Sequence, residues 1–248
     1  MIGISRLLGV NGKENAIHPI EEKWRYSNNA FPVNSMVESL GGWLLNASKK
    51  MSRLTISDAQ KFYRSHHGEL IADYKSLIRL IRDAKIRHPL SNSNYLHALS
   101  FTGLMMDETS YQFRMLTGGA LDGFLDTLRS NFEKMLERIR SNKATHKNCY
   151  ARVLIVNGET SKGVADLLSS YSDVLDLSNC RAEPGTEKDF RHFIVSDSDM
   201  LRDEQYHEPL SDSSDASDVV ADVHFFDPSR AKMFANRFDT FWTAVKAS

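Results

Sequence analysis

Apolar residues recur every three or four positions in the part of the chain that precedes residue 148. This spacing is typical of amphipathic helices that bury one face. It predicts helices within residues 35–50, 55–89, 92–106 and 118–143. Because neighbouring helices of this kind bury their apolar stripes against one another, we expect a helical bundle over residues 1–148.

The pattern changes after His146. Short runs rich in β-branched residues, bounded by turn residues, predict strands. Strands are expected within residues 150–156, 173–178, 190–196, 200–206 and 219–226, and helices within residues 161–172 and from Pro228 onward. Asp227 before Pro228 is a typical helix start. The order strand, helix, four strands, helix predicts a small mixed sheet with helices packed on it.

The fold class predicted is therefore α+β, with a helical domain at residues 1–148 and an α/β domain at residues 149–248. Two strands of the second domain, within 190–196 and 200–206, are expected to pair across the turn Asp197-Ser198-Asp199. The polar, acidic stretch that follows them, residues 207–218, is expected to be a mobile loop.

Charge is divided unequally between these halves. Residues 1–148 hold 21 Lys and Arg against 14 Asp and Glu, whereas residues 149–248 hold 10 against 18. The opposite signs favour contacts between the halves, pairing of copies, or binding of another macromolecule. A protein partner or self-association is therefore expected.

Composition and motifs limit the cellular location and the kinds of active site that we expect. No stretch approaches the roughly 20 apolar residues of a membrane span, and no signal peptide is recognised, so we expect a cytoplasmic protein. The two cysteines, Cys149 and Cys180, do not have metal-ligand spacing. No phosphate-binding loop, dinucleotide fingerprint, hydrolase elbow or zinc motif is found, and no cofactor is expected.

The order of elements in the second half carries a resemblance. The segment DFRHFIVSD, a hairpin return, the strand ADVHFFD and a last helix that contains FDTFW follow a strand, a helix and a strand. Over about residues 149–246 this order resembles the phospholipase D-like domain, and in particular its single, catalytically degenerate copies. Active members use two His-x-Lys-x4-Asp motifs, whose histidines attack phosphorus and protonate the leaving group.

The motif is incomplete here. Aligned with DFRHFIVSD, the histidine position falls on Phe190, the lysine position on His192 and the acid on Asp197. A frame that starts at His192 places Ile194 at the lysine and Asp199 at the acid. The resemblance therefore implies a domain without the two-histidine mechanism. The catalytic alternative pairs His192 with His224, if their two predicted strands are neighbours, with Asp197 as the acid.

The sequence holds two further groups of charged side chains. Basic residues that share helix faces in the first half predict an anion or nucleic-acid site at Lys75, Arg79, Arg82 and Arg138. The acids from Asp197 to Asp222 do not have the calcium-loop spacing, so they are expected to be solvated and no metal site is predicted.

The function predicted is a non-catalytic regulatory or assembly module, an accessory subunit of a bacterial complex that binds another macromolecule. Two alternatives remain open. The first is a degenerate phosphodiesterase or nuclease that uses His192, and the second is a nucleic-acid-binding protein that uses the basic helices of residues 1–148.

Overall fold

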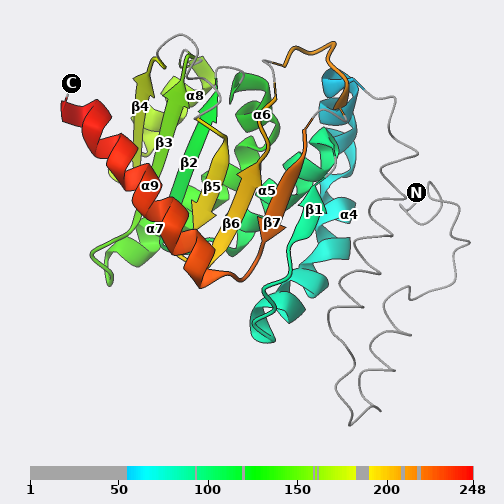
Figure 1. Ribbon diagram of the computed structural model, residues 1–248, viewed down its shortest axis with the longest axis horizontal. Coiled ribbons are helices and arrows are strands. Elements are labelled where there is room, and N and C mark those ends of the chain that lie inside the picture. Colours follow the sequence, from blue (N-terminus) through cyan, green and yellow to red (C-terminus); the bar gives the residue numbers. More distant parts are fainter. Residues whose placement is uncertain are drawn as a thin grey trace, which may run out of the picture.

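The computed structural model describes residues 55–92, 94–118, 121–158, 160, 162–182, 190–207, 210–216 and 219–247. The helix predicted within residues 35–50 lies outside these ranges. The described residues build a seven-stranded sheet with helices on both faces (Figure 1).

The strands are β1 (Leu90–Asn92), β2 (Gln112–Gly118), β3 (Tyr150–Val156), β4 (Leu175–Cys180), β5 (Phe193–Ser196), β6 (Met200–Glu204) and β7 (Ala221–His224). Across the sheet their order is β1-β7-β6-β5-β2-β3-β4. β2, β3 and β4 are parallel, and the other neighbouring pairs are antiparallel. The sheet is therefore mixed, as the sequence predicts for its second half.

The helices are α4 (Ile56–Asp83), α5 (Tyr95–Glu108), α6 (Leu121–Thr127), α7 (Arg129–Lys143), α8 (Lys162–Ser170) and α9 (Pro228–Ala247). Within the described ranges, α9 crosses one face of the sheet, and the other helices lie on the opposite face (Figure 1). After residue 148 the order β3, α8, β4, β5, β6, β7, α9 confirms the predicted order of elements.

Two strands correct the prediction of helices alone before residue 149. β1 pairs with β7, and β2 lies between β3 and β5, so both join strands from the second half. The sheet thus continues across residue 148, where the sequence predicts a domain boundary. The sequence pattern does not predict β2, because β2 is one short apolar run between two strong helical patterns. It does not predict β1, because β1 has only three residues.

Each face of the sheet has its own apolar core. Side chains of α9, including Phe234 and Phe238, pack on Leu116, Phe193 and Leu201. The larger core lies on the other face, between the sheet and the remaining helices. Within the described residues, none of the helices combines the length and apolar character that a bilayer crossing requires.

Candidate histidine and glutamate site

The β5–β6 hairpin places His192 opposite Glu204. Asp197 and Ser198 form its turn with φ of 46° and 64°, in the left-handed region, which aspartate enters more readily than most residues. Phe193 is paired with Asp203, and the Glu204 amide donates to the His192 carbonyl at 3.0 Å. Directly opposed residues project to the same face, so the two side chains meet.

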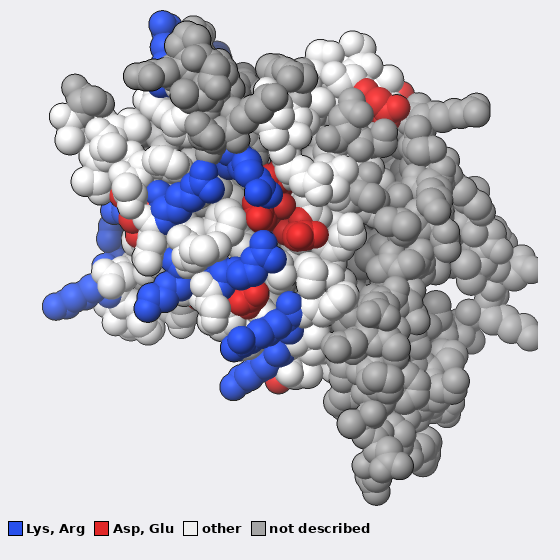
Figure 2. Space-filling view, in the orientation of Figure 1, with Lys and Arg blue, Asp and Glu red and all other residues white. Residues whose placement is uncertain are grey.

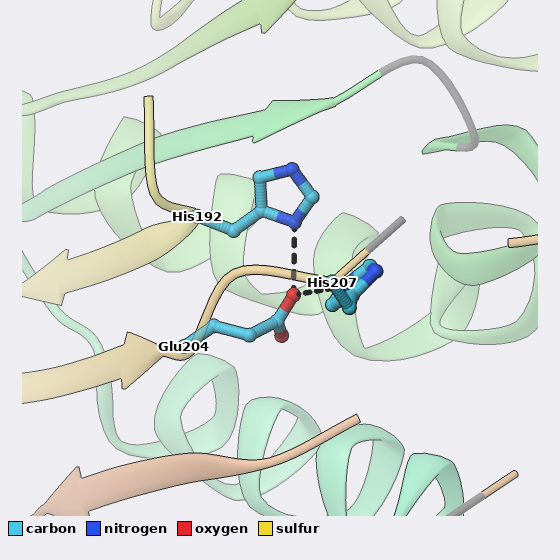
Figure 3. Close-up of side chains that lie close together, drawn as sticks. All are labelled: His192, Glu204 and His207. Carbon is cyan, nitrogen blue, oxygen red and sulfur yellow. Dashed lines mark hydrogen bonds and ion pairs between the residues drawn. The ribbon is translucent and has the colours of Figure 1, made fainter. Parts of the chain in front are cut away.

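Two imidazoles converge on one carboxylate oxygen at this point. Nδ1 of His192 and Nε2 of His207 each lie 2.8 Å from Oε1 of Glu204 (Figure 3). Together these three residues offer three metal-ligand atoms, one from each, that all lie within 4.8 Å of one another. Glu204 ends β6, and His207 follows it after two residues of loop.

The carboxylate is buried and paired with a cation. The side chains of Glu204 and Arg202 are 6% and 4% exposed, and Nη2 of Arg202 forms an ion pair with Oε2 of Glu204. Burial by itself would raise the pKa of Glu204, but Arg202 and the bonds to His192 and His207 hold that pKa well below its usual range. Glu204 is therefore ionised and presents Oε1 to the two rings.

Solvent reaches the site from the side of His192. The His192 side chain is 29% exposed, compared with 13% for His207. The His192 ring packs on the end of β2, where a Cβ added to Gly118 would lie 2.8 Å from its Nε2. Glycine at position 118 therefore leaves the space that this ring occupies.

The structure does not bring His192 and His224 together. His192 is opposite Glu204, whereas His224 is paired with Leu201 on the other side of β6. Because Leu201 and Glu204 are three positions apart on one strand, their side chains project to opposite faces. Arg230 donates to Nε2 of His224 at 3.0 Å, and the carbonyl of Arg87 lies 3.3 Å from Nδ1.

Burial, with the neighbouring Arg230 charge, lowers the pKa of His224. His224 is thus a neutral histidine with bonds at both ring nitrogens, and it has no contact with the Glu204 cluster.

Asp197, the predicted acid of the catalytic alternative, forms hydrogen bonds to the backbone instead. Its carboxylate accepts the amides of Ser110, Tyr111 and Gln112 at 2.6, 2.8 and 2.9 Å. These bonds attach the hairpin turn to the start of β2. Asp197 therefore has a structural role.

The four predicted anion-binding residues differ in their surroundings. Arg82 forms an ion pair with Asp199 at 3.2 Å. Arg138 donates to the carbonyls of Thr109, at 3.1 Å, and of Met106, at the end of α5. On α4, Lys75 is partly buried and Arg79 is exposed. Two of the four cations are therefore bound to other groups of this chain.

The acids of the predicted solvated stretch are not all solvated. Asp203 and Glu204 are buried, since both lie within a strand in the interior of the sheet. Sequence reasoning does not find Glu204 and His207, because it counts Glu204 among the solvated acids and places His207 in the mobile loop. The available signal was the predicted hairpin, whose turn at Asp197-Ser198-Asp199 fixes which residue lies opposite His192.

Comparisons with known proteins give only distant likenesses. No family model matches the chain, and no curated protein matches it. One similar solved structure is that of TrmBL2, an archaeal chromatin protein with a novel mode of DNA binding. The TM-score is 0.42 at 13% identity, over 81% of this chain and 69% of that one.

Another similar structure is NUC from Salmonella typhimurium, a phospholipase D family member. Its TM-score is 0.41 at 13% identity, over 63% of this chain and 95% of that one. Both TM-scores lie below 0.5, so neither likeness establishes a family or an activity for this chain.

Proposed function

We propose that the chain is a degenerate phospholipase D-like module that binds a divalent transition-metal ion through His192, Glu204 and His207. The observation that carries the proposal is the approach of three ligand atoms to within 4.8 Å of one another. Two imidazole nitrogens and one carboxylate oxygen suit Zn²⁺ and the neighbouring transition metals better than Ca²⁺ or Mg²⁺, which prefer oxygen ligands alone.

The surroundings of the three residues support this use. Arg202 pairs with Oε2 of Glu204, which orients the carboxylate and leaves Oε1 to face the histidines. An ion at this point would take the ring nitrogens that now bond Oε1, and because a protonated imidazole cannot bind a metal, binding weakens at low pH. The exposed side of His192 leaves room for water or for a ligand of a bound partner.

The proposal keeps the module non-catalytic. A two-histidine phosphodiesterase needs both imidazoles at one phosphorus, and His192 and His224 project from opposite faces. A metal site that orders the hairpin and the loop at His207 suits a regulatory or assembly subunit, whose partner surface it would stabilise.

The test is metal binding by the full chain after treatment with a chelator. Calorimetry with ZnCl2 and visible absorption with CoCl2 are expected to give one ion per chain, and the variants His192→Ala and His207→Ala are expected to lose it. His146→Ala is the matched control because His146 is exposed and lies outside the cluster. Equal binding by all four proteins, or none by the unaltered chain, would overturn the proposal.

Acid–base catalysis by the same two histidines is a second candidate. Because Oε1 of Glu204 accepts from Nδ1 of His192, Nε2 of that ring can serve as a base, and His207 lies beside it on the same carboxylate oxygen. A hydrolase of this kind would cleave a chromogenic phosphodiester in the presence of chelator. Absence of such turnover, or turnover that survives His192→Ala, would exclude it.

A further inference from the structure

Basic side chains gather on the face of the sheet that α9 crosses. Figure 2 shows Lys and Arg spread over this face, with fewer acids among them. Strand register and helix position place seven described cations there: Arg114, Arg152, Arg191, Arg230, Lys232, Arg237 and Lys246. The described acids on the same strands and helix are Asp176, Asp203, Asp222 and Asp239. We refer to this surface as the α9 face. It carries an excess of positive charge although the chain as a whole has a net charge of −1.

Aromatic rings are interleaved with these cations. The Arg152 guanidinium lies 4.3 Å from the centre of the Tyr150 ring and 5.4 Å from that of Trp242. The Lys246 ammonium lies 5.0 Å from the Trp242 ring. Such contacts hold cationic groups flat against aromatic surface. The α9 face therefore combines charge with planar groups on which other planar groups stack.

A second aromatic pair extends this surface. Phe190 and Phe241 have ring centres 5.3 Å apart, and Arg237 lies 5.5 Å above the Phe241 ring. Both phenylalanines are only partly buried. Apolar rings left partly open beside arginines are the usual platform for unpaired bases.

The acids of the α9 face hold the arginines in place. Asp239 lies 3.1 Å from Arg114 and 3.7 Å from Arg152. Near the start of α9, Asp203 lies 3.0 Å from Arg191 and 3.4 Å from Arg230. Each acid bridges two cations, so it fixes both and neutralises only one charge. Guanidinium groups ordered in advance lose less side-chain entropy when an anion binds.

We infer that the α9 face binds single-stranded nucleic acid. Phosphates are recognised by the six of these cations that are at least partly exposed, Arg114 being buried against Asp239, and bases are recognised by the rings of Tyr150, Phe190 and Phe241 or by the guanidinium planes. An acidic protein would use the charges but would leave the interleaved rings without a function. This surface is distinct from the one the sequence predicts at Lys75 and Arg79, and it does not depend on the proposed metal site.

The test uses the full chain and a labelled oligothymidylate of about 20 nucleotides, longer than a typical single-strand site. Fluorescence anisotropy is followed from about 50 to about 200 mM salt, and affinity is expected to fall steeply. The double variant Arg152→Ala with Lys246→Ala is expected to bind about tenfold less tightly, and its logarithmic salt slope to be about 1.4 smaller, because two phosphate contacts are removed.

Two further proteins make the result decisive. Lys232→Glu changes an exposed side chain, so it reverses a charge on the α9 face with little effect on folding, and it is expected to weaken binding. Lys75→Ala with Arg79→Ala is the matched control on α4 and is expected to bind as the unaltered chain does.

The inference is overturned if only this control loses affinity, if an acidic polypeptide competes as well as the oligonucleotide, or if a duplex of equal length binds more tightly. Binding is expected to be equal with and without chelator, which separates this test from that of the metal site.

Discussion

His192 and His224 project from opposite faces of the same sheet, although the segments that carry them both pair with β6. Their substitution should therefore have unrelated effects. His192→Ala is expected to abolish Zn²⁺ binding, while His224→Ala leaves it unchanged and lowers the free energy of unfolding by about 1 to 3 kcal/mol, because a buried, bonded ring is lost. Calorimetry and urea unfolding measure the two effects. Equal loss of Zn²⁺ affinity in both variants would contradict the arrangement.

Asp197 is expected to matter for stability and not for metal binding. Its carboxylate accepts three backbone amides, and Asn would replace one accepting oxygen by a donor that faces them. Asp197→Asn should lower the free energy of unfolding by about 1 to 3 kcal/mol in urea, with Zn²⁺ affinity retained. Asp212→Asn, at an exposed loop position, is the control and should change neither.

Much of the fold could be predicted from the sequence because it depends on local patterns. The β-branched runs at β3 and β5, the hairpin turn and the Asp227-Pro228 helix start each specify their own element. β2 could not be recognised in the same way. Its Phe113 and Met115 alternate with polar residues, but a single short run shows nothing of the two strands that bury it.

The candidate site was only partly predictable. The segment DFRHFIVSD indicates His192 as a candidate, and the structure confirms the hairpin that carries it. Its partners depend on register and on the path of the loop after β6. Without the register, Glu204 has the sequence pattern of a surface acid, and His207 opens a stretch whose composition is typical of a mobile loop.

Glu204 and Arg202 are expected to behave as a coupled pair. Glu204→Gln removes the negative charge and leaves a buried guanidinium without its ion-pair partner, so the free energy of unfolding should fall by about 3 to 5 kcal/mol. Adding Arg202→Met should recover most of that loss, because neither charge then remains buried. Urea unfolding of the two single variants and the double variant measures the coupling; additive losses would show that the residues act independently.

Asp199 predicts a pH dependence of stability. Burial raises its pKa from 3.8 to about 6, with Arg82 opposing and Asp197 adding to the rise. The folded state therefore holds this proton more tightly than the unfolded state does, and the stability so gained is present below about pH 4 and lost as the pH rises through about 6.

Asp199→Asn removes this loss. Relative to the unaltered chain, the variant should gain about 2 to 3 kcal/mol between pH 4 and pH 6 and no more above that window. Urea unfolding across this range tests the prediction, and a constant difference between the two proteins would contradict it.

Gly118 is expected to be necessary for full Zn²⁺ affinity but not for the fold. A Cβ at this position would lie 2.8 Å from Nε2 of His192, so Gly118→Ala must displace the ring. Zn²⁺ affinity should fall about tenfold, which corresponds to about 1.4 kcal/mol. Gly68→Ala is the control, because nothing lies within 4 Å of its added Cβ; it should leave Zn²⁺ affinity unchanged and stabilise α4 by up to about 1 kcal/mol.

β2 also determines how the chain must assemble as it leaves the ribosome. One of its neighbours, β3, is made soon after it, but the other, β5, begins only at Phe193. Until then β2 is an edge strand whose open side could pair with another nascent chain. Arg114 lies in the middle of that open side, opposite the future position of Val195. A charge placed there discourages premature pairing, so the arginine that later binds Asp239 first protects the unfinished sheet from aggregation.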